Sequence, residues 1–159
     1  FSHAVLDHLG EPLLALKEIY RVLRPGGVVG VRVISPEEAV QEPLDPVLQQ
    51  CREFADRLLT HNGGDRTIHR QLPALLRKAG FGRVQLSASY ESFGNPGAIR
   101  MWAERMAGTF TQPPVYEQLT ELGWASQVEL EQIAAAWRTW SDNPDAFFAR
   151  SWREAVAWK

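Results

Sequence analysis

Apolar residues recur at three- and four-residue steps from Glu11 to Leu23, and this spacing predicts an amphipathic helix. The sequence Pro25-Gly26-Gly27 then acts as a helix stop, because proline disfavours helical geometry before it and glycine accepts left-handed backbone angles. A short run of valine and isoleucine follows in residues 27–34, bounded by glycines and by Pro36. Such a run is typical of a strand that is buried on both faces of a parallel sheet.

The remaining chain continues this alternation of elements. Helical spacing covers residues 46–60, 72–79, 96–106, 113–122 and 126–140. Ser126 and Glu129 predict a capping box at the start of the last of these helices. Residues 83–91 alternate strictly, with Val84, Leu86, Ala88 and Tyr90 on one side, which predicts a half-buried strand near a sheet edge. In residues 146–159, Phe148, Trp152 and Val156 suit a helix and a strand equally. The pattern predicts an α/β fold with a mainly parallel sheet.

Composition narrows the class of protein and of partner. The chain has 159 residues, a formal net charge of -2 and 45% hydrophobic residues, as expected for one folded domain. Acidic and basic residues are interspersed, so neither nucleic-acid binding nor a membrane segment is indicated. A single cysteine, Cys51, fits a reducing compartment such as the cytoplasm, and its place on an apolar helix face indicates a core residue.

Polar residues gather at the start of the chain, where Ser2, His3, Asp7 and His8 lie close together in sequence. They suggest an H-x-H-x-D-H metal box, but the middle histidine of that box is replaced here by Val5. No metal site is therefore predicted. The glycines of "LRPGGVVG" follow a helix and precede a strand, which is the wrong order for a phosphate-binding loop.

Several motifs together resemble a known family. The chain reads "FSHAVLDHL", then "EIYRVLRPGG" and "VVGVRVI", and later "LPALLRKAGF" before a strand. This order resembles the second half of the class I S-adenosylmethionine-dependent methyltransferases, of the type found in ubiquinone and menaquinone biosynthesis. The resemblance implies the C-terminal half of a Rossmann-like fold, with a final antiparallel strand, helices on both faces and the first three strands absent.

The resemblance also implies a division of the chain and a function. Residues 1–91 would hold strands four to six, residues 92–145 a helical substrate-side insertion, and residues 146–159 the final strand. The activity would be methyl transfer from S-adenosylmethionine to a small-molecule acceptor. The family's glycine-rich cofactor loop has no counterpart here, so the chain is expected to be a fragment that is inactive alone.

Candidate site residues follow from the same resemblance and from the rule that ligands of open α/β sheets bind beyond the carboxyl ends of strands. Ser2, His3 and Ala4 would flank the methionine end of the cofactor. A histidine titrates near neutrality, so His8 is the first candidate for a general base, although a histidine bonded to backbone near a helix start is an equally good interpretation. The candidates for the substrate pocket are Asp7, Asn62, His69, Arg70 and Trp102.

A second hypothesis belongs to a different class of function. The chain could be a non-catalytic, methyltransferase-like module that pairs with a partner through an exposed sheet edge. Phe1 to Ala4 would form such an edge if the first three strands are absent. The sequence does not indicate an oligomeric state.

Overall fold

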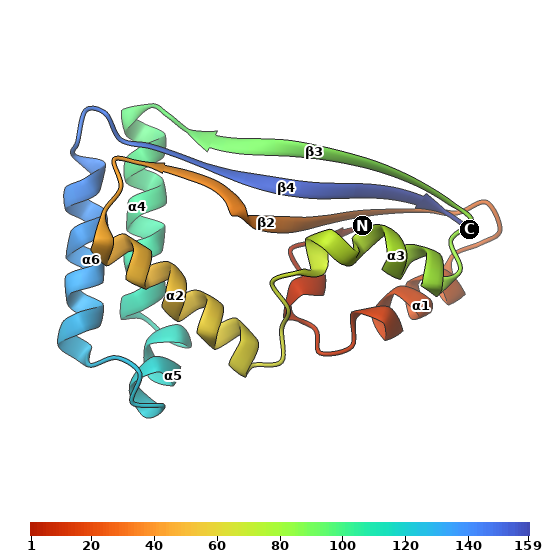
Figure 1. The fold of residues 1–159 in the computed structure, drawn as a ribbon, viewed down its shortest axis with the longest axis horizontal. Helices are drawn as coiled ribbons and strands as arrows, with labels where there is room; N and C mark the ends of the chain where they lie inside the picture. The colour runs from red at the N-terminus through yellow and green to blue at the C-terminus, as the bar shows by residue number, and fades with distance from the viewer. The chain divides into compact units, whose positions relative to one another are not determined.

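The computed structural model describes residues 1–159 and has the α/β class expected from the sequence. Figure 1 shows its elements in chain order. The strands are β1 (Ser2–His3), β2 (Val28–Glu42), β3 (Arg83–Phe93) and β4 (Phe147–Trp158). The helices are the 3-10 turn η1 (Leu6–His8), α1 (Pro12–Val22), α2 (Pro46–His61), α3 (Ile68–Ala79), α4 (Pro96–Thr111), α5 (Val115–Glu121) and α6 (Gln127–Ser141).

The four strands form one mixed sheet in the order β1-β2-β4-β3. β1 pairs in parallel with β2, with Ser2 opposite Val31 and His3 opposite Arg32. β4 runs opposite to both of its neighbours, β2 and β3 (Figure 1). The last strand of the chain is therefore inserted between two earlier ones as the antiparallel member of the sheet.

The chain divides into two compact units. The first comprises residues 1–39, 59–91 and 150–159, and the second comprises residues 40–58 and 92–149. This division differs from the three consecutive segments expected from the sequence, because residues 40–58 group with the later helices. The boundaries fall inside β2, α2, β3 and β4.

In the first unit, α1 and α3 pack on each other and on one face of β2. Alternate residues of β2 point to this core, and Val29, Val31 and Val33 are all at most 3% exposed. Leu16 of α1 and Leu72 of α3 are fully buried against them. Burial of such aliphatic side chains stabilises the unit by about 1.5–3 kcal/mol each.

The other face of β2 carries polar and aromatic groups. The guanidinium of Arg32 lies 4.3 Å from the ring centroid of Trp152, and its Nε is 3.0 Å from a carboxylate oxygen of Glu154. The ring of His3 packs on the same tryptophan at a centroid distance of 4.7 Å. The cation–π contact and the ion pair stabilise the arginine, and with the ring contact of His3 they link β1, β2 and β4.

The end of α1 is fixed by the last residue of the chain. The ammonium of Lys159 donates to the carbonyls of Tyr20, Arg21 and Leu23 at 2.7, 3.2 and 2.9 Å. These carbonyls have no partner within the helix, and a cation there also offsets the helix dipole. Gly80 ends α3 with φ of +113°, and a Cβ at this position would meet the ring of Tyr20 at 3.2 Å.

The second unit has its own core, built by α2, α4, α5 and α6 with many aromatic residues. Cys51 is 1% exposed and its sulfur accepts a hydrogen bond from the indole of Trp137 at 3.4 Å. Burial raises the pKa of this thiol to about 12, so the predicted core role of Cys51 is confirmed. The expected capping box is also present, with Ser126 and Glu129 bonded to each other at the start of α6.

Two expectations from the alternating pattern need correction. Residues 83–91 do form a strand at a sheet edge, but Leu86 and Tyr90 are 52% and 59% exposed, so the predicted half-buried face is wrong. The reason is that α3 covers Val84 at the start of β3 and not the residues beyond it. The segment that suited helix and strand equally, at the end of the chain, is the strand β4.

Two leucines of α1 test the packing of the first unit. Leu16 is fully buried and Leu14 is 59% exposed on the same helix. We expect Leu16→Ala to lower the free energy of unfolding by about 2–5 kcal/mol, because it leaves a cavity in the core. Leu14→Ala should change it by less than about 0.5 kcal/mol. Denaturant unfolding measures both, and equal losses for the two variants would contradict the assigned burial.

Candidate functional site

The end of β1 is an unusual stretch of backbone. Ala4 follows the strand with φ of +50°, in the left-handed region that non-glycine residues rarely adopt. Its N–H donates to the carbonyl of Arg32 at 2.9 Å, which continues the pairing with β2 by one residue. Such a conformation costs about 1–3 kcal/mol, and it turns the chain sharply at the carboxyl end of a strand.

The turn leads into η1, which buries Asp7 and leaves His8 exposed. Asp7 is 4% exposed, whereas the side chain of His8 is 63% exposed. The imidazole Nε2 of His8 lies 3.8 Å from Oδ2 of Asp7, a long contact that is an ion pair only when the imidazole is protonated. The other carboxylate oxygen of Asp7, Oδ1, is buried and accepts no hydrogen bond from the protein.

A second loop lies directly against η1. The N–H of Asp65 donates to the carbonyl of Asp7 at 2.9 Å. Gly64 passes so close to the same carbonyl that a Cβ would lie only 2.5 Å from it. Glycine is therefore required there for close approach, and it brings the loop that contains Asn62 to the polar end of β1.

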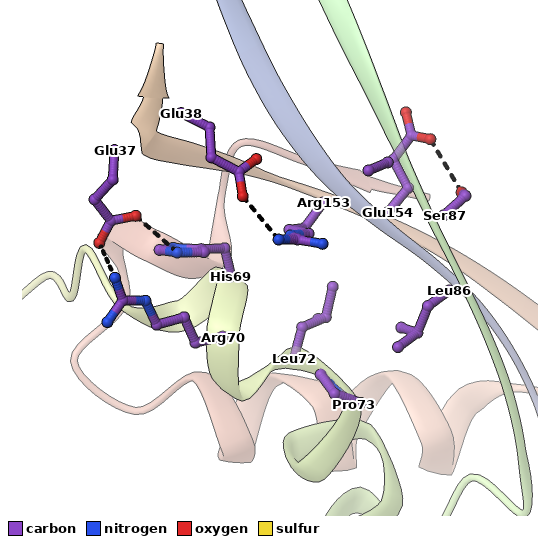
Figure 2. Close-up of a pocket in the computed structure, with 11 residues that line it drawn as sticks. Glu37, Glu38, His69, Arg70, Leu72, Pro73, Leu86, Ser87, Arg153 and Glu154 are labelled. Carbon is purple, nitrogen blue, oxygen red and sulfur yellow. Dashed lines mark hydrogen bonds and ion pairs between the residues drawn. The ribbon is translucent and has the colours of Figure 1, made fainter.

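A groove opens beside the start of α3 (Figure 2). It has a volume of about 630 Å³ and an apolar floor that includes Leu72, Pro73 and Leu86. Its rim is polar, with three carboxylates, two arginines and one histidine. The rim residues are Glu37, Glu38, Glu154, His69, Arg70 and Arg153.

His69 is the buried centre of this polar rim, with a side chain only 4% exposed. Its Nδ1 lies 2.9 Å from the carbonyl oxygen of Arg66, and its Nε2 lies 2.9 Å from a carboxylate oxygen of Glu37. Both neighbours are acceptors, so the ring donates to both only when both nitrogens carry a proton. The same carboxylate also binds Arg70 at 2.8 Å, so Glu37 joins two groups of α3 to β2.

The other carboxylates of the rim are held in the same way. The hydroxyl of Ser151 donates to Glu38 at 2.5 Å and, with Arg153 nearby, lowers the pKa of that carboxyl. Ser89 donates to Glu154 at 2.8 Å and lowers the pKa of that carboxyl too. These acids therefore stay ionised below the usual range of glutamates, and the rim keeps its alternating charges.

The structure places the residues selected from the sequence in separate groups, one at the end of β1 and one, with His69 and Arg70, at the groove beside α3. Asp7, His8 and the loop after Asn62 meet at the end of β1, and Asp65 of that loop leads into α3 with His69 and Arg70. Trp102 is different, because its ring lies in the core of the second unit and stacks on Phe148 at a centroid distance of 4.6 Å. Its assignment to the substrate pocket stays a prediction.

Four rim residues were missed by the sequence analysis. Glu37 and Glu38 lie on β2 beyond the apolar run that identified this strand, and Arg153 and Glu154 lie within β4. β2 extends to Glu42, eight residues past the strand expected from its valines, and the two glutamates fall in this extension. The only signal in the sequence was a pair of acids immediately after Pro36.

No group of three His, Cys, Asp or Glu side chains is arranged to hold a metal ion. None of the helices is both long enough and apolar enough to cross a membrane.

Comparison with known proteins gives one sequence family and one curated relative. Residues 1–31 match a family model described as a methyltransferase domain. The chain is 28% identical over 155 residues to "Probable methyltransferase ltbC" of Aspergillus luteorubrus, and the match covers 93% of this chain and 54% of that protein. The chain spans about half the length of this relative. The resemblance to methyltransferases inferred from the sequence is confirmed.

One solved structure supports the fold, and a second is reported for its sequence identity and coverage. A proposed methyltransferase of Bacillus halodurans C-125 aligns over 99% of this chain and 68% of its own, with a TM-score of 0.50 and 18% identity. Phosphoethanolamine N-methyltransferase 2 of Haemonchus contortus, solved with phosphomonomethylethanolamine and S-adenosylhomocysteine, aligns over 100% of this chain and 32% of its own, with a TM-score of 0.45 and 17% identity. The likeness to the Bacillus protein concerns the fold alone.

Asp7 offers a test of the site that needs no ligand. Its buried Oδ1 accepts no hydrogen bond, so removing this carboxylate oxygen from water lowers the free energy of unfolding. We expect Asp7→Asn to raise the free energy of unfolding by about 1 kcal/mol, because an amide costs less to bury than a carboxylate. Asp145→Asn, at an exposed position, is the control. A loss of stability for Asp7→Asn in denaturant unfolding would mean that Oδ1 is bonded in the folded protein.

Proposed function

We propose that this chain, which is related to methyltransferases over almost its whole length, is the carboxy-terminal part of an S-adenosylmethionine-dependent methyltransferase. The methyl acceptor in this proposal is a small molecule. Other strands of the sheet, and the glycine-rich loop of the family, would come from further residues of the same protein. The curated relative supports this, since the match covers only 54% of its length.

The observation that carries the proposal is the turn at the end of β1. The family match in residues 1–31 covers β1, η1 and α1 and ends within β2, which is the part of the chain that forms this turn. Ala4 adopts a strained left-handed conformation there, and strained backbone at a strand end is common at ligand sites. In open α/β sheets, ligands bind beyond the carboxyl ends of strands, which is where this turn lies.

The residues at this strand end fit the methionine end of the cofactor. Ser2 and Ala4 flank the turn, and the ring of His3 is held against Trp152 while the residue stays largely exposed. The unbonded Oδ1 of Asp7 is a buried acceptor only a few residues further on. A bound molecule with an N–H or O–H group at this place would satisfy it, and we assign that group to the acceptor molecule.

The proposed binding site for the methyl acceptor is formed by residues near Asp7. We place the acceptor beside η1 and the loop that packs against it, with Asn62, His69 and Arg70 as candidate residues of its pocket. The paired carboxylates and cations of the nearby groove fix the start of α3, so this side of the pocket is rigid before any ligand binds. Trp102 lies in the second unit and is not included in this assignment.

Methyl transfer depends mainly on the relative position of the cofactor and the methyl acceptor. The bound cofactor supplies a methyl group on a positively charged sulfur, and this group needs no further activation by the protein. Holding the acceptor and the bound cofactor in a reactive orientation would therefore be the largest contribution that the chain makes. A proton leaves the acceptor, and the exposed imidazole of His8 is placed to take it at Nε2 beside Asp7.

Cofactor binding tests the proposal directly. We expect the product of the complete reading frame that contains this chain to bind S-adenosylmethionine in calorimetry. The 159-residue chain alone should give no measurable heat, because the family's main cofactor loop is not among its residues. S-adenosylhomocysteine should compete with the cofactor.

The outcomes separate the two classes of function. Binding by the chain alone would overturn the division of the site between two parts of a longer protein. Failure of the complete product to bind either compound would overturn the methyltransferase proposal and favour a non-catalytic module.

His8 can be tested in the complete product with an acceptor found by screening labelled cofactor against small molecules. We expect His8→Gln to lower kcat by on the order of 100-fold and to leave the Kd for S-adenosylmethionine unchanged. The glutamine amide can form hydrogen bonds, but it is not basic enough to accept the proton. The acidic limb of the pH profile of kcat should disappear as well. Lys17→Gln, on the exposed face of α1, is the control. An unchanged kcat for His8→Gln would remove this residue from the role of base.

A further inference from the structure

β3 occupies one end of the sheet and pairs with β4 on one side only. Its outer edge therefore presents backbone N–H and C=O groups along residues 83–91, all within the first unit. The edge lacks the features that usually prevent pairing between proteins. It contains no proline and no lysine, and residues 85–90 carry no charge.

The side chains of this edge are unusually apolar for an exposed strand. Leu86 is 52% exposed and Tyr90 is 59% exposed, on the same side as Val84 and Ala88. Leu86 and Ala88 also belong to the wall of the groove beside α3. An apolar stripe next to a free backbone edge is the arrangement used for the addition of another strand.

The sequence of the edge is complementary to itself in the antiparallel direction. If Ser87 lies opposite Ser87 of a second copy, Arg83 falls opposite Glu91 at both ends of the paired segment. Between them, Val84 faces Tyr90 and Leu86 faces Ala88. Opposite charges and apolar pairs at directly opposed positions stabilise an antiparallel ladder.

From this complementarity we infer that the protein forms a symmetric dimer in which β3 of one copy pairs antiparallel with β3 of the other, centred on Ser87. The two end charges are held in place within each copy. The guanidinium of Arg83 lies 4.3 Å from the ring of Trp158, and Glu91 accepts from Arg150 at 2.7 Å. A two-fold axis makes every contact occur twice, as in most homodimers.

Other ways of pairing lose these contacts. A parallel arrangement in register would set Arg83 against Arg83 and Glu91 against Glu91, which is unfavourable for directly opposed charges. A shift of the antiparallel register by two residues would remove both Arg83–Glu91 pairs. The charges therefore select one register, and they favour a second copy of this chain over an unrelated peptide.

The mass in solution gives the first test. Light scattering after size-exclusion chromatography should report twice the 17.9 kDa mass of the chain at micromolar concentrations. Leu86→Lys should convert the dimer to a monomer, because it places a charge in the middle of the paired edge. Leu14→Lys makes the same change at an equally exposed position of α1 and should leave the dimer intact. A monomeric parent chain, or a dimer insensitive to Leu86→Lys, would overturn the inference.

Disulfide trapping tests the register. In the inferred dimer the two copies of residue 87 have Cα atoms about 4.5–5.5 Å apart, within the range for a disulfide. Ser87→Cys should therefore form a covalent dimer under mild oxidation. Gln85→Cys should not, because the two copies of residue 85 would lie roughly 13 Å apart along the strands. The native Cys51 is buried and does not interfere. Equal cross-linking of both variants, or none with Ser87→Cys, would overturn the register and with it the inference.

Discussion

The pairing of two residues of β1 with β2 is the constraint on which the site depends. Ser2 lies opposite Val31 and His3 opposite Arg32, in the middle of a strand whose other face is buried under α1 and α3. The N–H of Ala4 adds one more bond to this ladder before the chain turns away. Because β2 is fixed by its core residues, the position of the turn and of everything that follows it is fixed as well.

The turn has consequences for the loops around it. It places Asp7 under the loop of Gly64 and Asp65, and that loop leads directly into α3. At the start of α3, the two ring nitrogens of His69 lie 2.9 Å from the carbonyl oxygen of Arg66 and 2.9 Å from a carboxylate oxygen of Glu37 of β2, which links the helix back to the same strand. The Oδ1 of Asp7 is a buried carboxylate oxygen without a hydrogen-bond partner, and incomplete polar bonding of this kind is typical of a place that binds a ligand.

Much of this arrangement could be predicted from local sequence patterns, and the rest depended on distant contacts. The valines of β2, the leucines of α1 and α3 and the capping pair of α6 were identified correctly, because burial and capping leave a regular pattern in sequence. The exposure of Leu86 and Tyr90 was not predicted correctly, because it depends on how far α3 extends over β3. Glu37 and Arg153 were missed because only the folded sheet brings them to His69 and Glu38. Cofactor and acceptor residues could be named only through the resemblance to a family.

Hydrogen exchange of the complete reading-frame product with and without S-adenosylmethionine tests the central claim most directly, since it reports where a ligand protects the backbone. The account predicts slower exchange in the peptide that covers residues 1–9, which contains the end of β1 and η1. The helices of the second unit should exchange at an unchanged rate. Binding of the cofactor with no protection of residues 1–9 would contradict the placement of the cofactor at this strand end.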